Sequence, residues 1–281
     1  MVKAKATRPS KGKHPRTEHL TEQPAPMRIA ASATFAEMLH EQREVLRHLK
    51  LPPWLEFLLP YERRDQATLS PHEQQRFLCA LDLLIANGTY GKLVDVHAEM
   101  HMQHTSDRLL PWHRIFLLQL EQAIRAFHPD VSIPYWDWTN SSEESVPSWL
   151  AGVLPTVVTP TRTLSVVRAP GATSALATIA SNVPSIMAAT SYASFAPPMN
   201  GVHGSVHVWV GGTMSNPSTA AADPIFWMHH ANLDHLWWQW YNSSQGNHQN
   251  PPLVGMDAVM DPWAYTEPDT RDIAALGYTY A

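Results

Sequence analysis

The chain has 281 residues, of which 44% are hydrophobic and 16% are charged, and its formal net charge is −5. This apolar content supplies a core and excludes a wholly disordered chain, and no apolar run reaches the roughly 18 residues that indicate a membrane span. A single cysteine, Cys79, excludes an internal disulfide framework and a zinc site built on several thiolates.

Positive charge is concentrated near the N-terminus. Residues 1–28 hold seven Lys or Arg against two Glu, a local charge of +5, so the remaining residues sum to −10. An acidic body with a short basic tail is not typical of nucleic-acid-binding proteins. We expect residues 1–27 to be a disordered tail. Since this tail has neither the apolar run of a signal peptide nor a twin arginine, a cytoplasmic location is expected.

Helical patterns begin after the tail. Apolar residues recur at helical spacing over residues 34–49. The next helix is predicted over residues 71–87, because Ser70 can cap its first turn and Glu73 stands where a capping box requires an acidic side chain. A third helix is predicted to begin near Tyr90.

Further segments follow in chain order. A strong helical pattern covers residues 113–127, whereas residues 139–199 are rich in Pro, Ser, Thr and Ala and are predicted to be mostly loop. Helical spacing returns at residues 202–208. A last helix is predicted over residues 223–241, with Asp as its N-cap and Pro at its first position. Residues 277–280 alternate like a short strand.

Histidine is the strongest signal in the composition. The chain has 16 histidines, and most of them fall in two short windows. Clustered histidines with almost no cysteine indicate a metal held by imidazole nitrogens. The first window contains His97, His101, His104 and His113, and the second contains His203, His207, His229, His230 and His235.

The first window places three imidazoles within reach of one ion. His97 and His101 are four residues apart on a predicted helix, and His104 stays on nearly the same face if that helix continues. His113 opens the next helix, so the imidazoles can converge from two helices.

The second window has a similar geometry. His203 and His207 are four residues apart in a helical segment, which puts both rings on one face. His229 and His230 lie on the last helix and, as neighbours, point about 100° apart. We therefore expect one of this pair to be a ligand and the other to be its neighbour.

Ligand chemistry narrows the choice of metal. All-imidazole sites suit Zn, Cu, Fe or Ni, whereas Mg and Ca prefer oxygen ligands. One set of three histidines alone would also be compatible with a mononuclear zinc enzyme. Two sets from four antiparallel helices indicate a paired-metal centre inside a bundle, and the Glu-x-x-His motif of di-iron bundles is absent near these histidines. Copper is therefore favoured.

Several motifs resemble those of one known family. Residues 110–114 (LPWHR) resemble the first copper motif of the tyrosinases and catechol oxidases, which are type-3 copper proteins. Residues 207–212 (HVWVGG) and 223–234 (DPIFWMHHANLD) resemble the second motif, and residues 134–138 (PYWDW) and 278–280 (YTY) match further family landmarks.

The resemblance implies a mainly α fold, with a four-helix bundle core that holds a dinuclear copper centre, long loops and minor β structure. It covers about residues 60–281, which we expect to form a tyrosinase-like copper domain. Residues 1–59 are left as an N-terminal extension, made of the tail and the helix that follows it.

The resemblance also implies three histidine ligands for each of two copper ions. Of the adjacent pair, the resemblance implies that His230 and not His229 is the ligand. Because the segment from His97 to His104 is shorter than in many relatives, His101 is the substitute for His97. The implied ligands are His97, His104 and His113 for the first copper and His203, His207 and His230 for the second.

Other matched positions surround these ligands. Phe226 matches an aromatic residue that shields the second copper, and Asn232 and Asp234 match residues that orient ligand imidazoles from behind. Many relatives join a cysteine to the second ligand of the first copper by a thioether. Here the residue two before His104 is Met102, so no such crosslink is expected.

Two positions are relevant to which phenolic substrate the site accepts. Relatives that hydroxylate monophenols often carry Asn after the first histidine of the second copper, where it and a Glu hold a water that deprotonates the phenol. Here that residue is Gly204, and residues 194–199 contain no Glu. Val208 stands where some tyrosinases have Arg. Gly204 and Val208 are thus the candidate substrate-orienting positions, and neither offers a charge or a side-chain hydrogen bond.

The family resemblance implies an oxidase that uses O2 to convert o-diphenols (catechols) to o-quinones, with monophenol hydroxylation (tyrosinase activity) as a further activity. Alternatives are an o-aminophenol oxidase and a haemocyanin-like oxygen-binding protein. The short stretch after residue 234 disfavours the C-terminal plug domain of oxygen carriers. Whether a small copper-delivery partner is needed, and the oligomeric state, stay open.

Overall fold

The computed structural model describes residues 60–100, 103–104 and 107–281. The tail and the helix expected within residues 1–59 lie outside these residues, as does His101.

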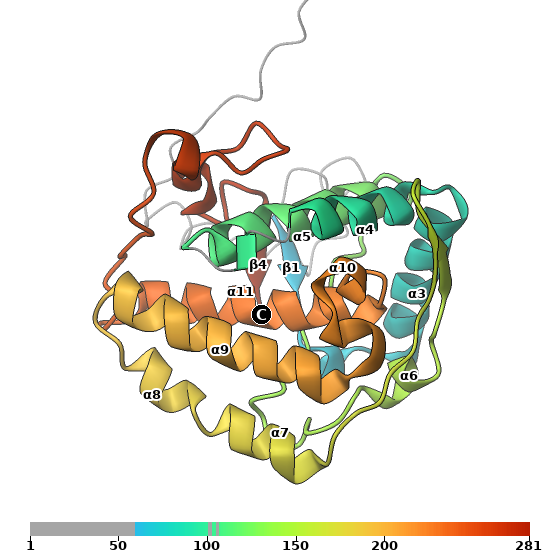
Figure 1. The fold of residues 1–281 in the computed structure, drawn as a ribbon, viewed down its shortest axis with the longest axis horizontal. Helices are drawn as coiled ribbons and strands as arrows, with labels where there is room; N and C mark the ends of the chain where they lie inside the picture. The colour runs from blue at the N-terminus through green and yellow to red at the C-terminus, as the bar shows by residue number, and fades with distance from the viewer. Residues whose placement is uncertain (1–59, 101–102, 105–106) are drawn as a thin grey trace, which may run out of the picture. The chain divides into compact units, whose positions relative to one another are not determined.

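Four helices form the centre of the fold: α4 (Thr89–Glu99), α5 (Leu109–Arg125), α9 (Tyr192–Val210) and α11 (Pro224–Asn242). α5 packs against α4 and α11, and α9 runs beside α11 (Figure 1). The prediction of a mainly α fold around four helices is confirmed. Each of these helices carries histidines on the side that faces the others.

The start of α3 (Pro71–Ala86) agrees with the prediction. The Ser70 hydroxyl accepts a hydrogen bond from the backbone N–H of Glu73, and the Glu73 carboxylate accepts one from the backbone N–H of Ser70. After Asn87, Gly88 takes a left-handed conformation with a φ of 80°. Glycine adopts this conformation without steric cost, so the chain turns within two residues into α4.

The predicted start is wrong for α5 and correct for α11. α5 begins at Leu109, four residues earlier than expected, so His113 lies in its second turn and does not open it. α11 begins as predicted, because the Asp223 carboxylate accepts a hydrogen bond from the backbone N–H of Ile225 and Pro224 occupies the first helical position.

The prediction that residues 139–199 are mostly loop is wrong. The region contains three short helices and a hairpin, and α9 begins within it. Short helices gain most of their stability from tertiary packing; here α7 and α8 pack on α9 and bury Leu176 and Ile186. The elements are α6 (Ser148–Ala151), β2 (Thr156–Val158), β3 (Thr163–Ser165), α7 (Thr173–Ala180) and α8 (Val183–Met187).

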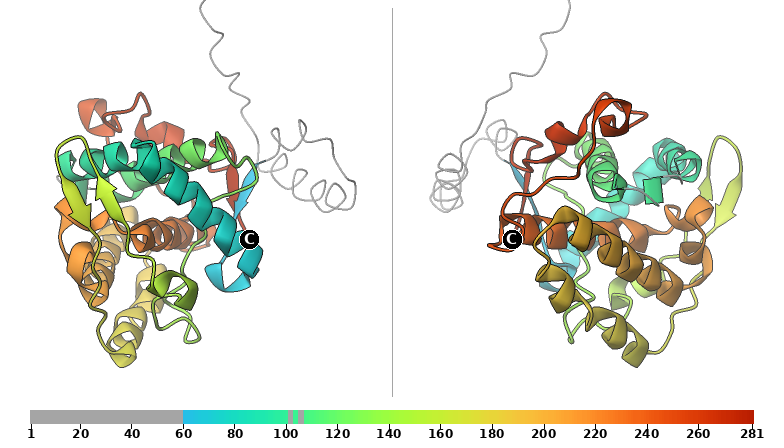
Figure 2. Two further views of the ribbon diagram at one scale, coloured as in Figure 1. Left: turned by 90° about the vertical axis from the view of Figure 1, so that its right-hand side faces the viewer. Right: turned by 60° about the vertical axis from the view of Figure 1, so that its left-hand side comes forward.

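The described β structure is minor. β1 (Tyr61–Arg63) pairs in parallel with β4 (Tyr278–Tyr280), which confirms the predicted C-terminal strand. β2 and β3 form an antiparallel hairpin that lies beside α4 (Figure 2). The remaining short elements are α10 (Pro217–Ala220) and 3-10 turns at Gln66–Thr68, Gly212–Ser215, Gly255–Ala258 and Glu267–Thr270.

In the described part of the chain, no single helix is both long and apolar enough to cross a bilayer. Only α3 and α4 together have such a length and composition, and an 80° bend separates them.

A buried charge network joins β1, α5, α11 and β4. The Arg63 guanidinium donates two hydrogen bonds to Glu121, at 2.9 and 2.6 Å, and one to Asp234, at 2.9 Å. Asp234 also accepts a hydrogen bond from Arg114 at 2.6 Å and one from each of the two β4 tyrosine hydroxyls, both at 2.6 Å. The two terminal strands are thereby tied to the helices that carry His113 and His230.

Candidate metal centre

The structure gathers the predicted histidines into two groups. In each group, one nitrogen of every imidazole lies within 4.8 Å of one nitrogen of every other. The first group comes from α4, α5 and the segment between them, and the second comes from α9 and α11. The groups are His97, His104 and His113, and then His203, His207, His229 and His230.

His104 reaches the first group in an unexpected way. α4 ends at Glu99, so His104 does not continue the helical face of His97; it lies in a short 3-10 turn. Its Nε2 atom is 3.0 Å from Nε2 of His97, and Nε2 of His113 is 3.5 Å from the same atom. The group therefore forms by a turn of the chain and not by helical periodicity.

Backbone carbonyls determine which nitrogen faces inward for two rings of the first group, His97 and His113. Nδ1 of His97 donates a hydrogen bond to the Pro217 carbonyl at 2.9 Å, and Nδ1 of His113 donates to the Leu109 carbonyl at 2.8 Å. A carbonyl only accepts, and a neutral imidazole carries one N–H. The Nε2 atoms of both rings are therefore bare lone pairs that face each other.

The same arrangement recurs in the second group. Nδ1 of His207 donates to the Met214 carbonyl at 2.9 Å, and Nδ1 of His203 donates to the side-chain oxygen of Asn200 at 3.1 Å. The amide nitrogen of Asn200 donates to the His104 carbonyl, which fixes the orientation of the amide. Nε2 of His203 is buried without a hydrogen-bond partner, and Nε2 of His207 lies 3.2 Å from Nε2 of His230.

Both members of the adjacent pair reach the second group, although only one was expected to do so. The rotation of about 100° between neighbouring residues fixes where the Cβ atoms point, whereas the imidazole rings beyond them can still turn toward a common centre. The rings of His229 and His230 differ in their partners. Nδ1 of His229 accepts a hydrogen bond from the indole N–H of Trp138 at 3.0 Å, whereas Nδ1 of His230 has no partner.

Electrostatics keep these imidazoles neutral. Burial, followed by repulsion from neighbouring imidazoles, lowers the pKa of His97, His113, His203 and His230 well below the usual value. Burial also lowers the pKa of His207 to about 4. Neutral rings present lone pairs at ordinary pH, and neutral imidazole is the form that binds metals.

The histidine groups fit a pair of first-row transition-metal ions. Buried lone pairs that face each other repel unless a cation lies between them. Ligand nitrogens about 2 Å from a tetrahedral ion are separated by about 3.3 Å, and the measured Nε2 separations run from 3.0 to 3.5 Å. Metal-bound histidines usually donate the other N–H to a carbonyl or carboxylate, as four of these rings do to an oxygen.

The two groups lie against each other around Phe226. The rings of His113 and His230 stack at 4.1 Å with an angle of 11°. Phe226 is buried and lies 4.2 Å from the His230 ring and 4.7 Å from the His97 ring, measured between centroids. The resemblance implied that Phe226 shields the second ion, and in the structure the residue contacts both groups.

The candidate substrate-orienting residues lie on the outer side of α9. Gly204 is half-buried and follows His203, and Val208 follows His207 and is 69% exposed. A Cβ atom at Gly204 would meet nothing within 4 Å beyond its chain neighbours and its own helix. Both positions thus offer space beside the second group and no polar group to a substrate.

The structure corrects the expectation for Asp234. Both of its carboxylate oxygens bind the charge network described above, where their hydrogen-bond donors are two arginines and two tyrosines and not a histidine ring. Asp234 therefore positions α11 against α5 and the strands and does not orient an imidazole directly. Asn232 is buried, and its amide nitrogen has no hydrogen-bond partner.

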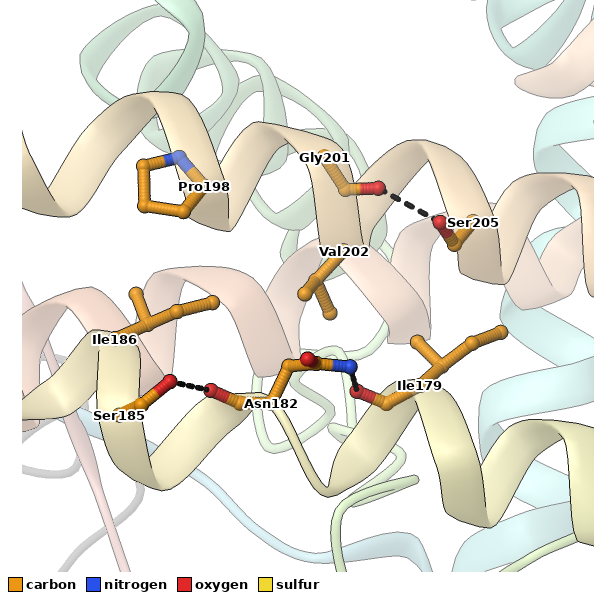
Figure 3. A pocket seen from close by; sticks show the side chains of 8 residues that line it. All are labelled: Ile179, Asn182, Ser185, Ile186, Pro198, Gly201, Val202 and Ser205. Carbon is orange, nitrogen blue, oxygen red and sulfur yellow. Dashed lines mark hydrogen bonds between the residues drawn. The ribbon is translucent and has the colours of Figure 1, made fainter.

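A separate hollow of about 400 Å³ lies between α9 and the helices α7 and α8 (Figure 3). It is lined by α7, α8 and α9, with Ile186, Pro198 and Val202 among its walls. No histidine is among its lining residues in the described chain, so this hollow is distinct from the histidine groups.

Sequence reasoning missed the residues that orient the histidines. Asn200 could have been found, because it stands three residues before His203 on the same helix. Trp138 entered only as part of a family landmark. The Pro217 carbonyl lies 120 residues from His97 along the chain, and no local pattern could have revealed it.

Comparison with known proteins identifies the family. The common central domain of tyrosinase matches residues 87–169 and 159–243. The tyrosinase of Streptomyces antibioticus is 30% identical over 269 residues, which covers 77% of this chain and 96% of that protein. The tyrosinase of Streptomyces lincolnensis is 29% identical over 261 residues, which covers 73% of this chain and 93% of the relative.

Solved structures agree on the fold. A functional unit of octopus hemocyanin matches with a TM-score of 0.68 at 22% identity and covers 78% of this chain and 68% of that chain. The tyrosinase of Burkholderia thailandensis matches with a TM-score of 0.65 at 18% identity, over 79% of this chain and 74% of that one. With two groups of inward-facing imidazoles on the same helical core, the chain belongs to the tyrosinase family.

Proposed function

We propose that this protein is a type-3 copper oxidase that uses O2 to oxidise o-diphenols to o-quinones. The observation that carries the proposal is the pair of buried histidine groups, in which neutral rings turn bare Nε2 atoms toward one another. Two bound copper ions would supply the redox chemistry, in which two diphenols give up four electrons and four protons and one O2 becomes two waters.

The proposed ligands are three histidines for each copper, bound through Nε2. The Nδ1 hydrogen bonds to Pro217, Leu109, Met214 and Asn200 hold four of these rings in place before metal binds. Imidazole-only coordination suits copper, as it also suits zinc, iron and nickel. The proposed sets are His97, His104 and His113 for the first ion and His203, His207 and His230 for the second.

The chain's own residues favour a substrate that ionises readily. A phenol must lose its proton before its oxygen can bind a metal, and its pKa is about 10. Gly204 and Val208 contribute neither a base nor a group that could hold a water acting as one. We therefore propose diphenol oxidation as the main activity and monophenol hydroxylation as the slower one.

The test is a paired assay of the copper-loaded protein. Oxygen uptake is measured with a catechol, the matching monophenol and the matching o-aminophenol, and copper is determined per chain. We expect two coppers and fastest oxygen uptake with the catechol. One zinc per chain with no copper after loading, or oxygen binding with no uptake on adding the catechol, would contradict the proposal.

Two alternatives have specific support. Oxygen carriage is supported by the match to the octopus hemocyanin unit. Oxidation of o-aminophenols is supported by a match to the grixazone synthase of Streptomyces griseus, 32% identical over 99 residues, which covers 31% of this chain and 32% of that protein. The paired assay separates these alternatives, since a carrier consumes no oxygen and an aminophenol oxidase prefers the o-aminophenol.

A further inference from the structure

The fourth imidazole of the second group has a different hydrogen-bond partner from the others. His229 lies in the second turn of α11, completely buried, with its ring 5.4 Å from the His203 ring and 5.0 Å from the His207 ring. By position alone it competes with His230 for a metal held by His203 and His207. The choice between the adjacent histidines therefore depends on which His229 atom faces the group.

The indole of Trp138 determines which nitrogen of His229 carries the proton. Its Nε1–H is a donor only, and it lies 3.0 Å from Nδ1 of His229. Nδ1 must therefore be the lone-pair nitrogen of a neutral ring, which places the proton on Nε2. Nε2 of His229 is buried and has no partner at ordinary hydrogen-bond geometry, although the His203 backbone lies near the ring. The other rings with an assigned donor, such as His203 and His207, have the opposite tautomer, with the proton on Nδ1.

We propose that Trp138 is a positioning residue that keeps His229 from binding metal. The indole occupies the only lone pair of His229 and forces an N–H toward the second group. The group then offers three ligating nitrogens and not four, and one coordination position of the ion stays open for O2 and substrate, as catalytic metal sites require. This inference rests on the proposed function, because it assumes that the second group holds a metal.

The first measurement tests the tautomer without any metal. Long-range ¹H–¹⁵N correlation spectra of the metal-free protein distinguish a protonated from a bare imidazole nitrogen, and the His229 signals are assigned by their loss in His229→Gln. We expect a bare Nδ1 and a protonated Nε2. A protonated Nδ1 would overturn the proposal. This result does not depend on whether the protein binds copper or oxidises a phenol.

The second measurement counts Cu(I) bound per chain. We expect two ions in the unaltered protein and in His229→Ala, and one in His230→Ala. Adding Trp138→Phe to His230→Ala removes the donor that keeps the proton on Nε2 of His229. The ring can then take the other tautomer, turn a bare Nε2 toward the group and restore binding of the second ion. The matched control is Trp136→Phe in the same background: Trp136 is equally buried in the same motif, but its indole donates to the Glu143 carbonyl. This control should leave one ion.

Trp138→Phe alone adds an activity readout. We expect it to keep two coppers and lose about 10- to 100-fold in diphenol oxidation, the usual cost of removing an outer partner of a metal site, because His229 can now fill the open position. Retention of the second ion in His230→Ala alone would contradict the inference. Should the unaltered protein bind no copper, the proposed function fails, and the tautomer spectrum still decides the role of Trp138.

Discussion

Gly204 and Val208 are the positions that we propose to face a substrate beside the second histidine group. The helix α9 presents His203 and His207 inward and Gly204 and Val208 toward its outer side, because successive residues are rotated by about 100°. The inner face of α9 is therefore occupied by imidazoles, while the outer face, which we propose to meet the substrate, carries no polar side chain at these two positions.

Gly204→Asn is expected to raise the ratio of the monophenol rate to the diphenol rate. An amide at this position can hold a water that accepts the phenol proton, and general-base assistance is worth about 10²–10⁴-fold. A gain of about tenfold is expected, since the upstream segment lacks a carboxylate to complete the water site. The measurement compares initial rates on a phenol and its catechol.

The matched control is Gly201→Asn. Gly201 lies on the same helix with the same open space at its Cβ position, but on the face that lines the separate hollow. The same helix-propensity change should leave the rate ratio unaltered. An equal gain in both variants would show that Gly204 has no special relation to the substrate.

At the scale of elements, the position of the second group depends on where α9 begins. Ser191 and Ser194 form a capping box, in which each side-chain oxygen accepts a hydrogen bond from the other residue's backbone N–H. This cap fixes the start of a helix that contains two prolines before it reaches His203. Weak local propensity is compensated by the cap and by the packing of α7 and α8.

Ser191→Ala should lower the free energy of unfolding by about 1 kcal/mol, the usual cost of losing an N-cap side chain. Copper content and diphenol rate should stay unchanged, because the cap lies three turns from His203. Urea unfolding of the two proteins gives the difference. Ser185→Ala is the control, since this exposed α8 hydroxyl only donates to the Asn182 carbonyl and should cost less. Equal losses would contradict the importance of the cap.

At the scale of the whole molecule, the buried network around Asp234 links the two terminal strands to the helices that carry the site. Arg63 and Arg114 are almost completely buried, so their charges depend on the Asp234 and Glu121 carboxylates. Removing one partner of a buried ion pair leaves an uncompensated charge and is more costly than losing an exposed pair.

Asp234→Ala is therefore expected to lower the free energy of unfolding by about 3–5 kcal/mol. Thermal or urea unfolding measures the loss. The comparison is Asp130→Ala, which breaks the solvent-exposed pair with Arg76 and should cost less than about 1 kcal/mol. If the two losses were similar, the buried network would stabilise the fold no more than an exposed ion pair does.

A second whole-molecule prediction concerns pH. Burial raises the pKa of Glu143 to about 7, and repulsion from Asp65 and Asp137 adds to the shift, although the hydrogen bond from Gln66 opposes it. The folded state therefore holds a proton that the unfolded state releases near the ordinary pKa of about 4.3. This contribution to stability is complete below the unfolded pKa and is lost as pH rises to 7.

Glu143→Gln imitates the protonated carboxyl and should remove this dependence. The difference in unfolding free energy between the two proteins should be small near pH 4.5 and grow in favour of the variant up to about pH 7. Glu144→Gln changes the same charge at the neighbouring, more exposed position and serves as the control. A constant difference across this pH range would contradict the raised pKa.

The sequence by itself determined the chemistry of the site and much of its scaffold. Histidines four residues apart on amphipathic segments, with almost no cysteine, already predicted an imidazole-bound metal pair, and the caps at Ser70 and Asp223 located two helices. These signals are readable because helical periodicity and capping act over three or four residues, within one stretch of chain.

Only the tertiary structure decided which nitrogen of each ring faces inward and what Asp234 binds. The Pro217 carbonyl that orients His97, the indole that orients His229 and the arginines that bind Asp234 all lie far along the chain from their partners. The short helices of residues 139–199 likewise form through packing on α9. A hydrogen bond or packing contact between distant segments leaves no local periodicity, so it becomes visible only once the chain has folded.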